Sequence, residues 1–132
     1  MVAFDFIQKL KKNQKELEIL GDGHQEKPFF LVEDCIEGMT CAFQKCNSRY
    51  QYDVFNLGCN TTTDVNRVAE IVVEEMGLPD VRFKYSGGRR GWPGDIPVTR
   101  FDVSKMQRLG WEARHTSDEA VRISARRILG KE

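Results

Sequence analysis

Residues 86–95 read Ser-Gly-Gly-Arg-Arg-Gly-Trp-Pro-Gly-Asp, a glycine-rich segment between strands predicted at 81–85 and 98–103. The surrounding residues 82–100 carry five basic side chains and a single acid, Asp95. Glycines let the backbone approach a ligand closely, and an arginine guanidinium offers a planar fork of donors that matches phosphate oxygens. The segment is therefore either a site for a phosphate and a ribose, with Asp95 accepting from sugar hydroxyls, or a solvated turn whose arginines face water.

Helix and strand patterns alternate on both sides of this segment. Hydrophobic spacing predicts helices at 4–10, 33–46, 64–76, 104–110 and 116–128. Short apolar runs predict strands at 17–20, 29–32, 53–58, 81–85 and 98–103. There is neither an internal repeat nor a domain boundary, so we expect one mixed α/β domain, α+β-like in arrangement, over residues 1–132.

Polar residues predict where several helices begin and end. Asp64 and Ser104 are expected to cap the helices that follow them, and Gly77 is expected to end the first of the two. Thr116 and Glu119 have the spacing of a capping box, in which the threonine hydroxyl accepts from a backbone amide and the glutamate reaches back.

Basic and acidic residues balance, with twenty of each and a formal net charge of +0. This balance excludes a polybasic arm or an acidic tail as the dominant feature of the chain, so we expect no nucleic-acid partner. Hydrophobic residues make up 40% and charged residues 30%, which excludes disorder of the whole chain. Because no apolar run approaches the roughly 18 residues of a membrane span and no export signal is present, we expect a cytoplasmic protein without a membrane partner.

The cysteine pattern argues against a metal site. The chain has four cysteines, Cys35, Cys41, Cys46 and Cys59. They form no C-x-x-C pair, and neither His24 nor His115 lies at a ligand spacing from them. We expect reduced thiols that act as small apolar side chains, and surface histidines.

Lys27 follows the turn Gly21-Asp22-Gly23 and precedes Phe29 and Phe30. A cation beside an aromatic pair could serve a phosphate and a stacked base, and the alternative is a surface lysine on a core strand. The turn is not a dinucleotide fingerprint, because Glu26 stands in place of its third glycine and a strand follows. The sequence also lacks the P-loop, G-x-S-x-G and H-E-x-x-H motifs, so it does not support a self-contained enzyme.

Six short motifs follow one another over essentially the whole chain. They are Phe4-Asp5-Phe6-Ile7 with Lys9-Leu10, Ile19-Leu20-Gly21-Asp22-Gly23, Val32-Glu33-Asp34, Phe55-Asn56-Leu57-Gly58, Gly87 to Asp95, and Asp102-Val103-Ser104-Lys105 followed by Leu109-Gly110-Trp111. In this order and spacing they resemble the C-terminal part of extended short-chain dehydrogenases/reductases, and especially the UDP-glucose 4-epimerases and archaeal-type NDP-sugar epimerases.

The resemblance implies a C-terminal, nucleotide-sugar-binding lobe without the Rossmann domain, a fragment of a larger two-domain enzyme. In that family the other half binds NAD and supplies a catalytic Tyr-x-x-x-Lys with its Ser or Thr. No tyrosine here has a lysine four residues later, so we expect no catalytic residue and no cofactor site in this chain. The full-length enzyme would transfer a hydride from the sugar C4 to NAD and back. The alternatives are the same lobe of a 4,6-dehydratase or decarboxylase, or a stand-alone interaction module that lost its catalytic half.

Position by position, the resemblance assigns five substrate-binding residues. Arg90 would clamp the diphosphate, and Asp95 would bind a ribose hydroxyl. Lys27 stands where many relatives have an arginine that contacts phosphate, so its contact would be a point charge. Val65 would touch the uracil or thymine ring, and Phe29 would line the pocket. The expected ligand is a UDP- or dTDP-sugar.

The family's layout also predicts uncovered surfaces. In the family, the helix after Glu33-Asp34 and the strand at 53–58 join the Rossmann domain, whose half is missing here. The apolar helix face of Ile36, Met39 and Phe43 and the edge of that strand would then lack cover. We therefore expect a homodimer or a swapped arrangement through these surfaces.

Overall fold

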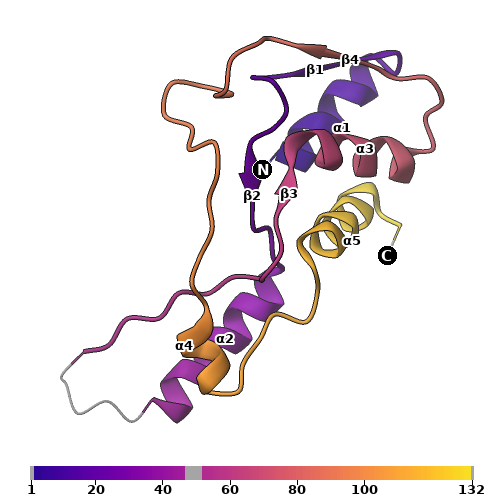
Figure 1. Cartoon of the computed structure of the whole chain (residues 1–132). Coiled ribbons are helices and arrows are strands. Elements are labelled where there is room, and N and C mark those ends of the chain that lie inside the picture. Colours follow the sequence, from indigo (N-terminus) through magenta and orange to yellow (C-terminus); the bar gives the residue numbers. More distant parts are fainter. Residues whose placement is uncertain (1, 47–51, 132) are drawn as a thin grey trace.

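The computed structural model describes residues 2–46 and 52–131, and within them it has a mixed α/β fold, as predicted (Figure 1). The helices are α1 (Val2–Lys12), α2 (Val32–Lys45), α3 (Val65–Met76), α4 (Ser104–Arg108) and α5 (Ser117–Leu129). The strands are β1 (Glu16–Ile19), β2 (Glu26–Lys27), β3 (Thr63–Asp64) and β4 (Arg82–Tyr85).

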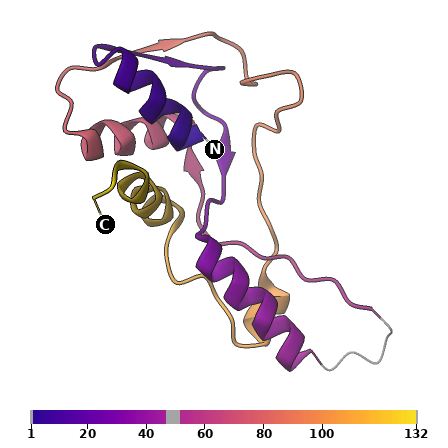
Figure 2. The same cartoon turned by 180° about the vertical axis from the view of Figure 1, so that it is seen from behind.

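The elements form a compact body and an arm, which the two opposite views show plainly (Figures 1 and 2). The body holds α1, α3 and α5, with β1 and β4 paired in parallel along one side. The arm holds α2 and α4 and extends away from the body. Between them, β2 pairs antiparallel with β3, and a single bridge joins Glu26 of β2 to Val98.

The hydrophobic core lies in the body. The three helices α1, α3 and α5 and strand β1 contribute its fully or almost fully buried side chains: Ala3, Phe6, Ile7, Leu10, Leu17, Ile19, Val68, Ala69, Ile71, Val72, Val121 and Ala125. On α1 and α3 these residues recur at three- and four-residue spacing, so each helix presents one apolar stripe to the others. The core therefore closes without any contribution from α2 or α4.

Three of the predicted helix boundary signals are confirmed. The Asp64 carboxylate accepts from the backbone N–H of Arg67 at 2.7 Å, and Gly77 ends α3 with a left-handed φ of 65°. The Thr116 hydroxyl accepts from the backbone N–H of Glu119, whose carboxylate accepts from the N–H of Thr116 at 2.8 Å. These boundary signals involve residues within one helical turn, so the predictions do not depend on how distant parts of the chain pack.

The predicted cap at Ser104 is wrong. Val103 precedes the first turn of α4, and no side chain caps that helix in the usual way. Instead, the backbone N–H of Ser104 donates to the Asp102 carboxylate at 2.9 Å, so an acid two residues upstream fixes the start of this short helix.

The predicted strand at 29–32 does not form. Pro28 lacks the N–H that a ladder needs, and the Phe29 N–H donates to the Ser117 hydroxyl at 3.0 Å. Strand β2 therefore ends at Lys27, and α2 already begins at Val32.

The strands predicted at 53–58 and 98–103 are also wrong. Residues 53–58 run without ladder partners, and side chains hold them: Lys105 donates to the Val54 carbonyl at 2.8 Å, and Asn56 donates to the Asp102 carbonyl at 3.2 Å. Of residues 98–103, only Val98 makes a bridge. A sequence run can favour an extended backbone, but a strand also needs a neighbouring strand.

The arm is packed on one side and open on the other. The buried ring of Trp111 and the side chain of Leu57 lie against Gly38 of α2. The opposite side of α2 carries the apolar side chains of Ile36, Met39 and Phe43, which are exposed among the described residues of this chain.

Two further sequence expectations concern cysteines and membranes. The four cysteines are free thiols, although Cys59 alone among them is fully buried. Among the described helices, none combines the length and apolar character that a bilayer crossing requires.

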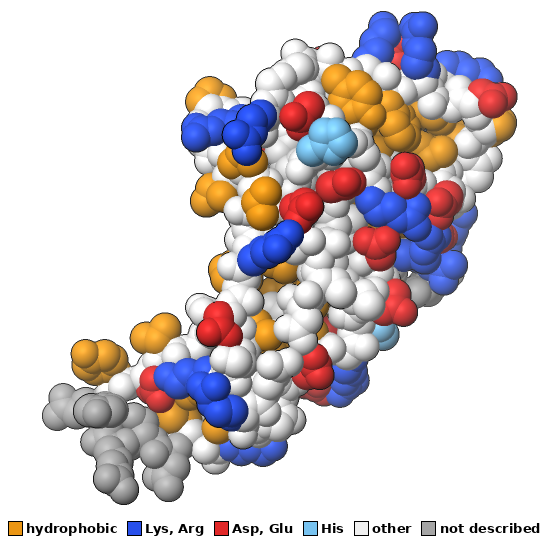
Figure 3. Space-filling model, in the orientation of Figure 1, with side chains coloured by type: hydrophobic (Ala, Val, Ile, Leu, Met, Phe, Trp, Pro, Cys, Tyr) orange, Lys and Arg blue, Asp and Glu red, His pale blue; other side chains and the backbone are white. Residues whose placement is uncertain are grey.

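Helices α3 and α5 are joined by an ion-pair network, which appears as interleaved basic and acidic side chains on the surface (Figure 3). Its most buried member is Glu75, whose carboxylate contacts Arg122 at 2.6 Å and Arg126 at 2.9 Å. These two guanidinium groups, Arg126 first, outweigh the effect of burial and lower the pKa of Glu75 below its ordinary value. Arg122 also reaches Glu74 at 2.6 Å.

This network makes the stability of the body dependent on pH. A carboxylate with a lowered pKa in the folded state stabilises the fold above its unfolded pKa of about 4.3, and that contribution is lost as the pH falls through the folded pKa. Glu75→Gln should lower the free energy of unfolding at pH 7 by about 1–3 kcal/mol. Denaturant unfolding from pH 7 to pH 3 should show a smaller acid-induced loss in the variant than in the wild type. Equal losses in both chains would contradict the role of Glu75.

Candidate functional site

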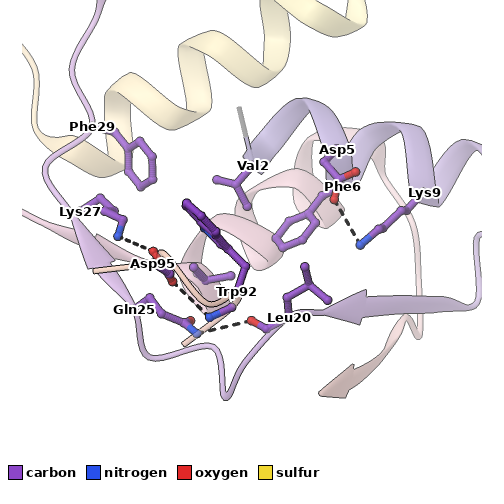
Figure 4. A pocket seen from close by; sticks show the side chains of 12 residues that line it. Val2, Asp5, Phe6, Lys9, Leu20, Gln25, Lys27, Phe29, Trp92 and Asp95 are labelled. Atoms are coloured by element: carbon purple, nitrogen blue, oxygen red, sulfur yellow. Dashed lines mark hydrogen bonds and ion pairs between the residues drawn. The ribbon is translucent and has the colours of Figure 1, made fainter. Parts of the chain in front are cut away.

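The candidate site is a pocket of about 380 Å³ on the body (Figure 4). Its walls come from α1, the turn between β1 and β2, the start of α3 and the glycine-rich segment. The lining residues are Val2, Asp5, Phe6, Lys9, Leu20, Gln25, Lys27, Phe29, Val65, Gly91, Trp92 and Asp95. Four of the five residues that sequence analysis assigned to substrate binding, Lys27, Phe29, Val65 and Asp95, therefore lie together in one concave surface.

The turn after β1 anchors the glycine-rich segment beside β2. Gly21 has a φ of 82°, and a Cβ at this position would lie 1.9 Å from the Gln25 amide nitrogen. The Gly21 N–H donates to the Ser86 hydroxyl at 2.8 Å, and the Gly21 carbonyl accepts from the Gly87 N–H at 3.0 Å. Only glycine satisfies both the left-handed backbone and the close approach, so the turn fixes where the segment begins.

The polar end of the pocket is an ion pair between two of the predicted residues. Lys27 Nζ lies 2.9 Å from Asp95 Oδ1 and also donates to the Ile96 carbonyl. The other carboxylate oxygen of Asp95 accepts from the Gly91 N–H at 3.1 Å. Burial alone would raise the pKa of Asp95, but the hydrogen bonds from Lys27 and Gly91 outweigh it and lower this pKa below its ordinary value. Asp95 is therefore a carboxylate at neutral pH, with its negative charge balanced by Lys27.

Apart from Gln25 and a second ion pair, Asp5–Lys9 at 3.2 Å, the rest of the pocket is apolar and aromatic. Trp92 is 61% exposed, and in Figure 4 its ring lies between those of Phe29 and Phe6. A Cβ on Gly94 would lie 2.2 Å from the Trp92 ring, so the ring rests directly on the glycine backbone of its own turn. Aromatic and aliphatic side chains in this arrangement can cover the faces of a planar ring.

Arg90 lies outside the pocket lining. It is exposed, and its guanidinium donates to the Pro93 carbonyl at 3.3 Å, within the same loop. Asp95 lines the pocket and pairs with Lys27, whereas Arg90 does not line it, and no ion pair between Arg90 and Asp95 forms among the described residues. A role for Arg90 at a ligand would require its side chain to leave Pro93 and turn toward the pocket mouth.

Sequence analysis did not identify Trp92 and Gln25 as lining residues of the pocket. Trp92 belongs to the glycine-rich motif, but no pattern indicated which way its ring would point. Gln25 is almost fully buried; its Nε2 donates to the Leu20 carbonyl at 3.4 Å, while its Oε1 has no hydrogen-bond partner among the described residues. A buried acceptor without a partner is costly, so Gln25 is the least satisfied polar side chain of the pocket lining.

The described residues do not form a dinucleotide or metal site. The turn after β1 leads into β2, whereas a dinucleotide site needs a glycine-rich turn that opens a helix whose N-terminus faces the pyrophosphate. In the part of the chain that the structure describes, no group of three or more His, Cys, Asp or Glu side chains is placed to hold a metal ion.

Several known proteins are similar to this chain in sequence and in fold. Residues 1–58 match the NAD dependent epimerase/dehydratase family. GDP-mannose 3,5-epimerase of Arabidopsis thaliana is 27% identical over 121 residues, which are 90% of this chain and 29% of that protein. The crystal structure of a UDP-galactose 4-epimerase aligns with 99% of this chain and 41% of its own, at 30% identity and a TM-score of 0.83. MoeE5 in complex with UDP-glucuronic acid and NAD aligns with 96% of this chain and 41% of its own, at 28% identity and a TM-score of 0.71.

Over almost its whole length, this chain is similar to the NDP-sugar epimerase-like group of extended short-chain dehydrogenases/reductases. The predicted resemblance is confirmed, and so is the mixed α/β fold of a partial short-chain dehydrogenase/reductase domain. The epimerase-like chain spans well under half the length of the relatives it matches. What those longer proteins do as a whole is thus not a property of these 132 residues by themselves.

The Lys27–Asp95 pair makes a measurable prediction. Lys27→Ala removes the cation that opposes the effect of burial on the pKa of Asp95. This pKa should therefore rise, so that the carboxylate protonates at a higher pH. A pH titration of the Asp95 side-chain carboxyl carbon by NMR measures this shift directly. Arg100→Ala is the control, because Arg100 contacts Glu26 and not Asp95. An unchanged Asp95 titration in Lys27→Ala would show that the ion pair does not form in solution.

Proposed function

We propose that this chain is the nucleotide-sugar-binding, C-terminal lobe of an NAD-dependent NDP-sugar epimerase, and that it is inactive without the rest of such an enzyme. The observation that carries the proposal is the pocket that gathers Lys27, Phe29, Val65 and Asp95. The epimerase relatives and the UDP-sugar named in the MoeE5 structure support the ligand class.

In this proposal the ion pair is exchanged for contacts with the ligand. A phosphate oxygen at the pocket would compete with Asp95 for Lys27 Nζ, and the released carboxylate oxygen could accept from a ribose hydroxyl. Both charges keep a partner during this exchange: the Lys27 ammonium contacts the phosphate, and the Asp95 carboxylate accepts from neutral donors. The Gly91 N–H would hold Asp95 in place during the exchange.

The aromatic half of the pocket suits the base. Trp92 and Phe29 offer faces on which a pyrimidine can stack, and Val65 at the start of α3 would close one edge.

The chemistry itself would come from elsewhere. No tyrosine in the sequence precedes a lysine by four residues, and the described residues form no dinucleotide site. The chain's contribution would be to bind and orient the nucleotide end of the substrate, since remote binding of this kind positions a reacting sugar. NAD would be bound by the part of the relatives' fold that these residues do not cover.

The proposal predicts saturable binding of UMP and of UDP-glucose by the chain alone, measured by isothermal titration calorimetry. Lys27→Ala should weaken binding by about tenfold or more, because a hydrogen bond to a charged group contributes roughly 1.5–3 kcal/mol. Arg90→Ala should have a similar effect, because in the proposal the Arg90 guanidinium leaves the Pro93 carbonyl and binds the diphosphate. Arg89→Ala is the matched control: it removes the neighbouring exposed arginine, to which the proposal gives no ligand contact, and binding should be unchanged.

The outcomes separate the hypotheses left by the sequence. Equal weakening by Arg89→Ala and Arg90→Ala would reduce the effect to general charge and remove Arg90 from the site. No saturable binding of UMP, UDP-glucose or dTDP would overturn the proposal and favour the stand-alone interaction module. NAD added alone should give no binding heat.

A further inference from the structure

Two of the proposed ligand residues flank a single buried proline. Lys27 and Phe29 both line the pocket, and in Figure 4 they lie on the same side of it, across from the α1 residues. Pro28 between them is buried and has no N–H, and strand β2 ends at Lys27, so no ladder continues here. The Phe29 N–H approaches the Lys27 carbonyl at 3.2 Å, which closes a tight three-residue turn. The turn thus depends on contacts from outside it for its place in the pocket wall.

The Ser117 hydroxyl makes that outside contact. It accepts from the Phe29 N–H at 3.0 Å and lies 3.4 Å from the Lys27 carbonyl, so one oxygen contacts both ends of the turn. Ser117 is the first residue of α5, it is completely buried, and it does not itself line the pocket. Its own N–H donates to the Thr61 hydroxyl at 2.7 Å, which fixes the backbone that carries this side chain. A residue 88 positions beyond Phe29 thus holds the pocket wall from behind the lining.

The direction of the hydrogen bonds around Ser117 follows from the groups present. The Thr63 hydroxyl lies 2.7 Å from Ser117 Oγ and 2.7 Å from Asp118 Oδ1, and Asp118 is paired with Arg67 at 3.0 Å. A carboxylate only accepts, so the single hydroxyl proton of Thr63 goes to Asp118, and the Ser117 hydroxyl donates to Thr63. The Ser117 oxygen then has only lone pairs left, and these accept from the Phe29 N–H. A continuous series of hydrogen bonds therefore runs from the pocket wall through two buried hydroxyls to a carboxylate.

We propose that Ser117 is a positioning residue for nucleotide binding, whose hydroxyl holds the turn 27–29 so that its ammonium and its phenyl ring face the ligand together. This inference rests on the proposed function, which gives both side chains a ligand contact. Buried hydroxyls linked in series polarise one another, so the series holds the turn more firmly than one exposed hydrogen bond would. Without the Ser117 oxygen, the Phe29 N–H would keep only the bond within its own turn, and the turn could shift relative to Asp95.

The alternative is that Ser117 only stabilises the fold, as a buried serine at the start of a helix can. Two observations favour positioning. The capping box of α5 is complete without the Ser117 side chain, because Thr116 and Glu119 supply it. Among the described residues, every polar contact of the Ser117 side chain goes to the turn or to Thr63, which pairs with Lys27 across β2 and β3. The hydroxyl therefore acts on the pocket wall and contributes nothing to the helix cap.

Calorimetric titration of Ser117→Ala with UMP tests the proposal. Binding should weaken by about three- to tenfold, the size expected for the loss of one hydrogen bond between uncharged groups. The NMR titration of Asp95 should move to higher pH in this variant, by less than in Lys27→Ala, because the ammonium remains but is held less firmly. Lower stability alone would move neither quantity in the folded chain. Thr61→Val is the matched control: it removes another hydroxyl bound to Ser117, at the backbone N–H and away from the turn, and should leave both quantities unchanged.

Thr63→Val is the second variant, in case Ser117→Ala does not fold. Valine is close to threonine in volume and lacks the oxygen that accepts from Ser117, so UMP binding should weaken in the same direction but by less. Unchanged binding and an unchanged Asp95 titration in Ser117→Ala, or in Thr63→Val if only that variant folds, would overturn the role of Ser117. Equal effects of Ser117→Ala and Thr61→Val would do the same. A wild-type chain that does not bind UMP would overturn the proposed function instead, and the Asp95 titration would still decide whether Ser117 positions Lys27.

Discussion

The contact between Lys27 and Asp95 decides what the pocket can do. It joins β2 to the glycine-rich segment across 68 positions of sequence, and it neutralises the only carboxylate that the segment contributes. Without it, the pocket would offer a partly buried anion, which repels a phosphate. With it, the same two side chains offer a cation to the phosphate and an acceptor to a sugar hydroxyl as soon as they separate. In the proposed function, this one ion pair would give the pocket its preference for a nucleotide.

The backbone around this contact is built to hold it in place. Gly21 places the start of the segment through Ser86 and Gly87, and Gly91 donates directly to Asp95. Within the glycine-rich segment, Gly94 allows a close contact that a side chain would prevent, because a Cβ there would meet the ring of Trp92. Gly87 and Gly88 instead supply positive φ angles of 84° and 86° in open space.

The sequence predicted the features that depend on neighbouring residues, such as helix caps. It did not predict those that depend on contacts between distant parts of the chain, such as strand pairing. Asp64, Gly77 and the capping box at Thr116 depend on residues within a turn of themselves, so the sequence alone predicted them. The runs at 29–32, 53–58 and 98–103 favour extended backbone, but whether a neighbour pairs with them depends on distant parts of the chain. The same reason explains the site: residue types suggested Lys27 and Asp95, whereas the inward ring of Trp92, the buried Gln25 and the outward Arg90 follow from tertiary packing.

The pocket and the exposed side of α2 lie on different parts of the molecule, and this separation has a physical consequence. The pocket is built from the body, whose core closes without α2, while the exposed side of α2 belongs to the arm, which the body contacts sparsely. No residue of the pocket lining lies on α2. A ligand in the pocket could change the exposed side of α2 only by interacting differently with two states of the arm. The pocket and the exposed side of α2 are therefore separate surfaces, each held in place by its own local contacts.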